Sequence, residues 1–292
     1  MVKPNKLYQL SFRISAGRAD ALDELLAAAG VQMVVWVKEK SRTVLYSQYL
    51  PSAAEAAALK QSLVRLMAHV STGRIPIVKI KAIRQKDWSE AWKRYFHVFR
   101  CGRHMVVRPT WEQYKAEPGD IVIDMDPGMA FGSGHHGTTR GCLVFLEKVA
   151  DKLRKGSVLD VGCGSGILAI AAAKLGCRDV TAIDNDPQAV KVARENIAIN
   201  GLKGRIKCRT ADLAKLEKRP LHDVVVANIL AEVLEKYADN IVRVVKKSGV
   251  LIVSGILIAQ YSAVKKALVV RGFREKSAII DGEWKSGLFC LC

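Results

Sequence analysis

The chain has 292 residues, half of them apolar and a quarter charged, which is typical of about two globular domains and not of a disordered or fibrous protein. No run approaches the roughly 18 uninterrupted apolar residues of a transmembrane helix, and the N-terminus lacks the apolar core of a signal peptide. We therefore expect a cytoplasmic protein without membrane contact. Seven cysteines without a Cys-x-x-Cys pair favour reduced thiols over a disulfide framework or a zinc site.

The formal net charge of +18 is unevenly distributed. Residues 1–86 contain 14 Lys and Arg against 5 Asp and Glu, so less than a third of the chain carries half of the excess. A field of this sign attracts polyanions. The N-terminal segment therefore predicts contact with RNA, a ribosome or an acidic protein, and the alternative is a generally basic chain without such a partner.

Residues 1–84 predict a small α+β domain. Four segments alternate apolar with polar residues or are rich in β-branched and aromatic ones, as strands are, and two Ala-rich segments carry helix start or stop signals such as Ser52. In chain order, the expected elements are strand 7–14, helix 18–29, strands 31–37 and 43–49, helix 52–69 and strand 75–83. This β-α-β-β-α-β order is the ferredoxin-like pattern.

Residues 85–118 are expected to link this domain to the rest of the chain. Four aromatic residues recur there at helical spacing, which predicts a helix that packs against a neighbouring domain. These residues are Trp88, Trp92, Tyr95 and Phe96.

Residues 119–292 show short apolar strands that alternate with helices, the pattern of a parallel, doubly wound α/β sheet. The final two strands are separated only by a short turn and should form an antiparallel hairpin. The strands are expected at 157–161, 180–183, 206–208, 224–227, 250–256, 273–280 and 287–291, and the helices at 167–175, 187–200, 232–245 and 261–270.

The most informative segment lies at the end of the strand 157–161. The chain runs directly into Gly162, Gly164 and Gly166, and glycines at such a turn let a ligand approach the backbone closely. Asp184 ends the next strand, where an acidic side chain can accept hydrogen bonds from both hydroxyls of a ribose. The glycines and the acid together predict a nucleoside cofactor.

The spacing of the glycines favours S-adenosylmethionine among these cofactors. Gly-x-Gly-x-Gly differs from the dinucleotide motif, and a triphosphate-binding motif is absent. S-adenosylmethionine has a ribose and an adenine but no phosphate, so it fits such a loop. Asp160 could hold loop N–H groups or the methionine ammonium, and Asp212 could accept from the adenine amine or be a solvated loop residue.

Two further segments are candidates for the same site as the glycine loop. Residues 126–139 are glycine-rich and predict a mobile lid. Asn228 follows the fourth strand, at the edge where ligands bind in open parallel sheets, and its carbonyl oxygen can accept a hydrogen bond from an amine. The adjacent His135 and His136 have no acidic or cysteine partner at helical spacing, so we expect no metal site.

These segments resemble the bacterial methyltransferases of ribosomal protein L-eleven, over essentially the whole chain. The resemblance rests on residues 87–92, 126–139, 160–166, 184–187 and 228–231. It implies a doubly wound seven-stranded class I methyltransferase sheet at 119–292, a linker at 85–118 and a ferredoxin-like domain at 1–84 that captures the ribosomal protein. The reaction it implies is transfer of methyl groups from S-adenosylmethionine to lysine and N-terminal amino groups of that protein.

The resemblance also assigns site residues by motif position. Asn228 is the expected catalytic residue. The expected cofactor contacts are Thr139, Gly162, Asp184 and Asn228, to which the glycine-loop analysis adds Asp160 and Gly164. The loop departs from the commonest family form at Ser133, His135 and Gly137, which replace two threonines and a proline and predict greater flexibility.

Two other functions are compatible with parts of the sequence. An RNA or small-molecule methyltransferase would use the same fold, but residues 228–231 lack the Pro-Pro-aromatic run with which base-methylating enzymes stack a flipped base. A non-catalytic ribosome-associated module is the third hypothesis, and the intact set of glycines, Asp184 and Asn228 argues against it.

Overall fold

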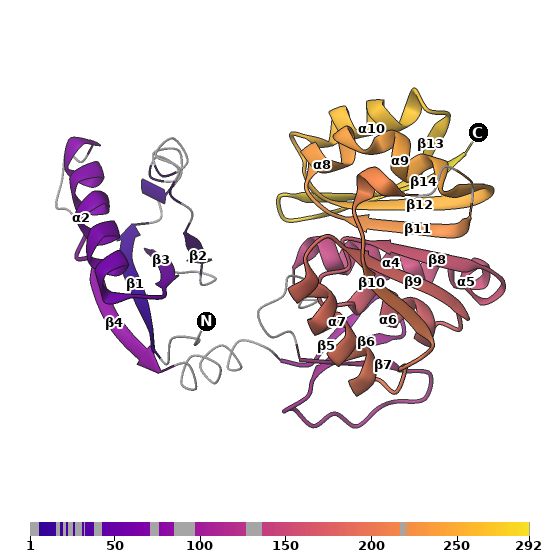
Figure 1. Cartoon of the computed structure of the whole chain (residues 1–292), viewed down its shortest axis with the longest axis horizontal. Coiled ribbons are helices and arrows are strands. Elements are labelled where there is room, and N and C mark those ends of the chain that lie inside the picture. Colours follow the sequence, from indigo (N-terminus) through magenta and orange to yellow (C-terminus); the bar gives the residue numbers. More distant parts are fainter. Residues whose placement is uncertain are drawn as a thin grey trace. The chain divides into compact units, whose positions relative to one another are not determined.

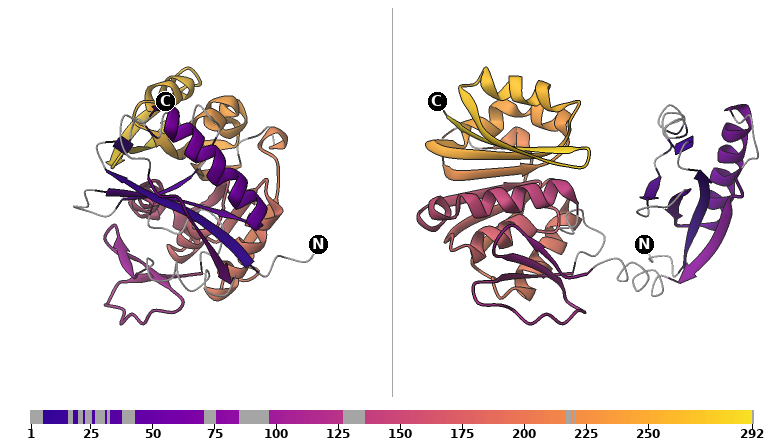
Figure 2. Two further views of the ribbon diagram at one scale, coloured as in Figure 1. Left: turned by 90° about the vertical axis from the view of Figure 1, so that its left-hand side faces the viewer. Right: turned by 180° about the vertical axis from the view of Figure 1, so that it is seen from behind.

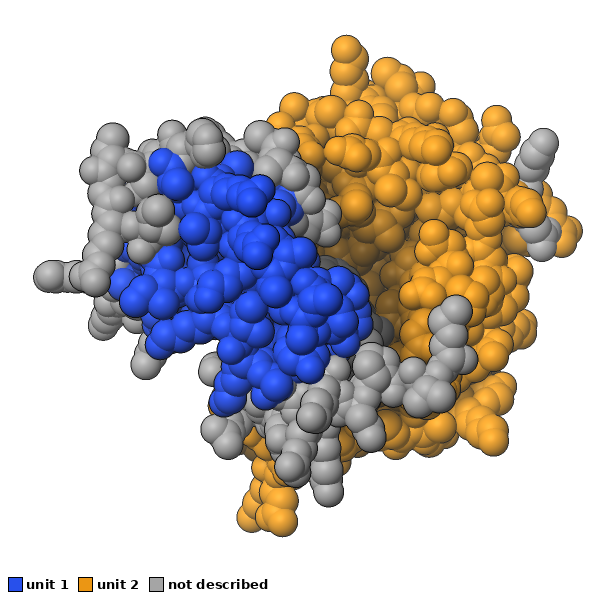
Figure 3. Space-filling view, turned by 60° about the vertical axis from the view of Figure 1, so that its left-hand side comes forward, with its two compact units in different colours: residues 1–95 blue, residues 96–292 orange. Residues whose placement is uncertain are grey.

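The computed structural model describes residues 6–15, 18, 19, 22, 26, 31, 33–37, 43–70, 76–84, 97–126, 136–216, 219 and 221–291. The chain divides into two compact units, residues 1–95 and 96–292, which Figure 3 shows in separate colours. None of the helices within the described ranges is long and apolar enough to cross a membrane.

The first unit contains an antiparallel four-stranded sheet in the order β2-β3-β1-β4, with helix α2 against one face (Figure 1). This order confirms the ferredoxin-like prediction, although the helix expected at 18–29 falls mostly outside the described residues. The elements are β1 (Lys6–Ser15), β2 (Val34–Val37), β3 (Thr43–Leu50), α2 (Ala53–Val70) and β4 (Lys79–Arg84).

Alternation along β1 produces the core of this unit. Leu10, Phe12 and Ile14 are buried and pack in one cluster with Leu63 and Met67 of α2. The helix begins as predicted, because the Ser52 hydroxyl accepts a hydrogen bond from the backbone N–H of Glu55 at 3.2 Å, which satisfies an otherwise unpaired group of the first turn.

The second unit is built on a seven-stranded sheet in the order β10-β9-β8-β11-β12-β14-β13. The first five strands of this order are parallel, and β14 pairs antiparallel with both β12 and β13, as the predicted closing hairpin requires. The strands are β8 (Ser157–Val161), β9 (Asp179–Asp184), β10 (Ile206–Thr210), β11 (His222–Asn228), β12 (Val245–Leu257), β13 (Phe273–Asp281) and β14 (Trp284–Leu291).

Helices cover both faces of this sheet, and Figure 2 shows the two layers on opposite sides. Successive residues of β11 are buried on opposite faces, with Val224 and Val226 in one cluster and Val225 and Ala227 in the other, which explains the uninterrupted apolar run. The helices are α4 (Gly137–Lys148), α5 (Ala150–Lys155), α6 (Ile167–Lys174), α7 (Pro187–Ile199), α8 (Ala231–Lys236), α9 (Ala238–Arg243) and α10 (Tyr261–Val269).

Three details differ from the sequence predictions. The single helix expected at 232–245 is divided into α8 and α9 at Tyr237, and β12 begins at Val245, before the expected start at 250. Residues 85–118, predicted as a linker, also contain two strands of a separate sheet, which lie before the alternation of strands and helices that marks the parallel sheet. That sheet is β5 (Phe99–Cys101), β6 (Met105–Pro109) and β7 (Ile121–Met125).

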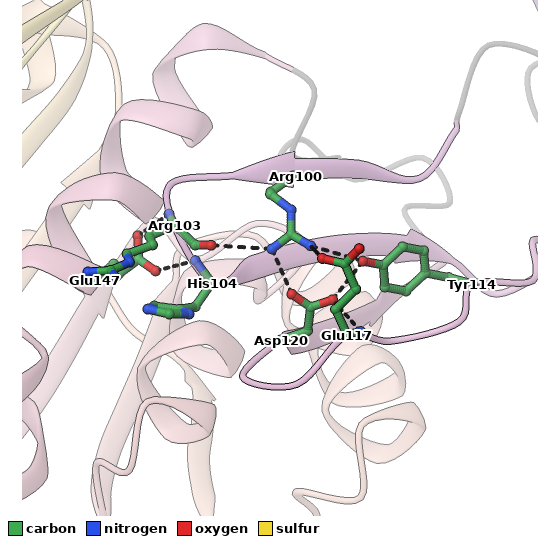
Figure 4. Close-up of polar contacts among 7 residues, drawn as sticks. All are labelled: Arg100, Arg103, His104, Tyr114, Glu117, Asp120 and Glu147. Atoms are coloured by element: carbon green, nitrogen blue, oxygen red, sulfur yellow. Dashed lines mark hydrogen bonds and ion pairs between the residues drawn. The ribbon is translucent and has the colours of Figure 1, made fainter.

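Charged groups fasten this small sheet (Figure 4). The Arg100 guanidinium donates to the Asp120 carboxylate at 2.6 Å, and the Tyr114 hydroxyl donates to its other oxygen at 2.6 Å, so these bonds lower the pKa of Asp120 to about 2. Glu147 of α4 accepts from the backbone N–H groups of Arg103 and His104 at 2.7 and 2.6 Å. The turn between β5 and β6 is thereby tied to α4.

Candidate active site

The glycine loop between β8 and α6 adopts a backbone that other residues rarely tolerate. Gly162, Gly164 and Gly166 have φ values of 67, 51 and 81°. A Cβ atom on Gly162 would lie 2.4 Å from Cγ2 of Ile229, and one on Gly166 would lie 3.1 Å from Cβ of Ala193. Glycine is therefore required both for the turn and for the close approach of the neighbouring segments.

Asp184 at the end of β9 holds the glycine loop. One carboxylate oxygen accepts from the backbone N–H of Gly164 at 2.9 Å, and the other accepts from that of Asp186 at 3.0 Å. The backbone N–H of Cys163 also donates to the Ile183 carbonyl at 2.9 Å. Each oxygen of Asp184 still has a lone pair, so the carboxylate is fixed beside the loop with capacity for further hydrogen bonds.

Asp160 binds the first turn of α6 and not the N–H groups of the glycine loop, which was one of its two predicted roles. Its side chain is fully buried, and one oxygen accepts from the backbone N–H of Ala169 in the first turn of α6 at 3.0 Å. The other oxygen is buried without a partner among the described residues. Burial raises the pKa of Asp160 to about 7.

Asn228 and Thr139 meet at the carboxyl edge of the sheet. The Asn228 side-chain N–H group donates to the Thr139 hydroxyl at 3.3 Å, and the Asn228 Oδ1 atom is buried without a partner in the described structure. The segments that carry them are linked to β12, because Ser254 donates from its hydroxyl to the Thr138 carbonyl at 3.0 Å and accepts at its own carbonyl from the N–H of Ile229 at 3.2 Å. The amide is therefore held with its oxygen available.

The predicted lid is described only at its two ends. Residues 127–135, with Ser133 and His135, lie outside the described residues, so the lid remains a prediction. The His136 ring contacts the Thr138 hydroxyl at 2.8 Å and the edge of Trp284, and burial lowers its pKa. A Cβ atom on Gly137 would lie 3.0 Å from Cγ of Asp281, so glycine at this position allows a close contact with β13.

One residue that the sequence analysis missed belongs to this region. Asn196 of α7 is fully buried, and its side chain contacts the backbone of both Ser165 and Asp126. A polar residue on the same helical face as the buried Ala193 and Ile197 was the available signal.

Asp212, the candidate partner of the adenine amine, is exposed, and its carboxylate accepts from the N–H of Ala214 at 2.9 Å, so it caps a short 3₁₀ turn. Within the described ranges, no group of three metal-ligating side chains is present.

A sheet of this strand order, with a glycine loop after its first parallel strand and an acidic residue after the next, defines a class I methyltransferase. Comparison with known proteins identifies the particular family. The model of the family "Ribosomal protein L11 methyltransferase (PrmA)" matches residues 6–289, and the chain belongs to this family.

Individual relatives agree with this assignment. The chain is 42% identical over 237 residues to the ribosomal protein L11 methyltransferase of Pelotomaculum thermopropionicum, covering 81% of this chain and 76% of the relative. It is 45% identical over 237 residues to that of Geobacter sulfurreducens, covering 80% and 75%. The crystal structure of ribosomal protein L11 methylase from Lactobacillus delbrueckii subsp. bulgaricus has a TM-score of 0.59 at 33% identity, covering 68% of this chain and 98% of that chain.

Proposed function

We propose that the protein transfers methyl groups from S-adenosylmethionine to lysine and N-terminal amino groups of ribosomal protein L11. The observation that carries the proposal is the buried Oδ1 atom of Asn228, which has no partner among the described residues and stands at the carboxyl end of β11. An amide oxygen at this edge can accept an N–H bond from an incoming amine. The L11 substrate is the one for which the relatives are named.

The residues present fit the proposed cofactor. Asp184 retains lone pairs for two ribose hydroxyls, and Gly162 and Gly164 present backbone without a side chain. The unpaired Asp160 oxygen lies directly before the loop and suits a cationic group. When bound, S-adenosylmethionine supplies an electrophilic methyl group on a positively charged sulfur.

The contribution of Asn228 is to orient the amine. Its Oδ1 atom accepts one N–H of a neutral amine and points the nitrogen lone pair towards the methyl group, while Thr139 fixes the amide through Nδ2. Alignment of two reacting groups contributes strongly to rate, since a displacement of about 1 Å can cost about 100-fold. We assign no general base, because an amine that arrives neutral does not require a strong one.

We assign capture of ribosomal protein L11 to residues 1–84 and include a contact of this domain with ribosomal RNA. Strands β1 to β4 contain no acidic residue, and the side chains of Arg13, Lys79 and Lys81 are exposed on them. Such a surface suits phosphates. Replacing Lys79 and Lys81 by glutamine should lower the slope of log affinity against log salt by about 2 for ribosomal RNA, and an unchanged slope would contradict the contact.

We also propose a cytoplasmic location. The six described cysteines are free, as a cytoplasmic location would require.

The central test is mass spectrometry of purified ribosomal protein L11 after incubation with this protein and S-adenosylmethionine. We expect additions of about 14 Da for each methyl group, at lysine and N-terminal amines, and about 100-fold slower addition with Asn228→Ala. Absence of methylation by the wild-type protein, with cofactor binding still detected by calorimetry, would contradict L11 as the substrate and favour another protein or RNA. Absence of cofactor binding as well would favour a non-catalytic module.

A further inference from the structure

Asn196 of α7 and Asn200, the residue directly after this helix, bind the backbone at the C-terminal end of β7 and just beyond it. Asn200 accepts from the N–H of Asp124 at 3.0 Å and donates to the carbonyl of the same residue at 2.6 Å. Asn196, one turn earlier, accepts from the N–H of Asp126 at 3.0 Å. The two side-chain amides thus bind backbone groups of this segment that a neighbouring strand would otherwise bind.

The two asparagines differ in their second bond. Asn200 gives its amide N–H groups to Asp124 and to the carbonyl of Asn196 on its own helix at 2.9 Å. Asn196 instead donates to the carbonyl of Ser165 at 2.9 Å, between Gly164 and Gly166 of the glycine loop. Of the two asparagines, Asn196 is therefore the one that joins the residue directly after β7 to the glycine loop.

Among the described residues, the Ser165 contact joins two other bonds that hold the loop from outside. These are the N–H of Cys163 on the Ile183 carbonyl and the N–H of Gly164 on Asp184. Glycines at Gly164 and Gly166 leave the backbone free to take other conformations, so these external bonds select one of them. The bond from Asn196 is fully buried, and an unpaired amide or carbonyl group costs free energy there. Loop conformations in which this bond is broken are therefore disfavoured.

We propose that Asn196 is a positioning residue that sets the conformation of the glycine loop for cofactor binding and couples it to the end of β7. It acts through Ser165 and does not itself touch the cofactor. This inference rests on the proposed function for its consequence in binding, but the effect on the loop is a property of the cofactor-free protein.

The test compares Asn196→Asp and Asn196→Ala with Asn200→Ala as the matched control. Asn196→Asp retains an acceptor for the N–H of Asp126 and, when ionised, places a second oxygen against the Ser165 carbonyl, so it removes the loop bond. A protonated carboxyl could keep that bond, so this variant is measured above about pH 8. Asn200→Ala weakens the attachment to β7 but leaves Ser165 bound. The measurements are the dissociation constant of S-adenosylhomocysteine by calorimetry, the thermal midpoint, and amide hydrogen exchange across residues 162–166 without any ligand.

We expect both Asn196 variants to weaken S-adenosylhomocysteine binding about tenfold and to accelerate exchange in the glycine loop. Asn200→Ala should lower the thermal midpoint while the dissociation constant changes by less than about twofold. The inference is overturned when the Asn196 variants match Asn200→Ala in loop exchange and in affinity. If wild-type protein binds no S-adenosylhomocysteine, the proposed cofactor is wrong, and loop exchange still decides the role of Asn196.

Discussion

Asn228 and Thr139 lie 89 residues apart in the chain and are joined by a hydrogen bond of 3.3 Å from the amide nitrogen to the hydroxyl. In this arrangement the amide nitrogen is used by Thr139, and the oxygen is left without a partner among the described residues. The first turn of α4 and the end of β11 therefore act together in presenting one acceptor atom.

Replacing Asn228 by alanine should lower kcat about 100-fold, because the amine loses the group that orients it. The dissociation constant of S-adenosylmethionine should rise by less than about threefold, since Asp184 and the glycine loop are untouched. Steady-state kinetics on L11 together with calorimetry separate the two effects. Thr139→Val removes the hydroxyl at nearly constant volume and should give a smaller loss in kcat, whereas a wild-type kcat in both variants would contradict the role of the pair.

Replacing Asp184 by alanine should weaken cofactor binding about 100-fold, because hydrogen bonds from two ribose hydroxyls to a carboxylate are lost. The N–H of Gly164 also loses its acceptor, so the loop should exchange faster. Asp186→Ala is the matched control, since its carboxylate caps α7 through the N–H of Gln188 at 2.8 Å. This control should cost about 1 kcal/mol of stability with little change in affinity. Equal affinity losses in the two variants, measured by calorimetry, would contradict the assignment of Asp184.

The sequence predicted which segments form the strands of the parallel sheet, because buried parallel strands read as continuous apolar runs. It also predicted Gly162, Asp184 and Asn228 at strand ends, where parallel topology gathers them at one edge. It did not reveal β5 and β6, since they lie before the alternation of strands and helices by which the strands of the parallel sheet were recognised. Nor did it reveal Asn196, whose partners at Ser165 and Asp126 are brought to it only by tertiary packing.

The close approach of Gly162 to Ile229 predicts a large cost for any side chain in the loop. Gly162→Ala should destabilise the protein by about 2–4 kcal/mol, because a positive φ and a contact of 2.4 Å act together. Displacement of Ile229 would also move Asn228, so kcat should fall. Gly201→Ala provides the control, since φ is 69° there with no atom within 4 Å of the added Cβ, and it should cost only about 1 kcal/mol. Similar urea midpoints for both variants would contradict the steric argument.

The buried Asp160 predicts a pH dependence of stability of unusual sign for a carboxylic acid. Burial raises its pKa from 3.8 to about 7, so the folded state binds this proton more tightly than the unfolded state does. The stability that this group contributes is therefore fully present below about pH 4 and is lost as the pH rises towards 7.

Asp160→Asn removes the titration, so the free energy of unfolding of the variant relative to wild type should increase between pH 4 and 7 and then level off. Urea unfolding across this range measures the difference. Asp239→Asn is a control of opposite sign, because Arg271 lowers the pKa of Asp239 through a hydrogen bond. That pair contributes stability above about pH 4 that is lost on acidification. The free energy of unfolding of Asp239→Asn should therefore lie below that of wild type at neutral pH, and the difference should shrink as the pH falls. Parallel pH profiles of Asp160→Asn and wild type would show that Asp160 keeps an ordinary pKa despite its burial.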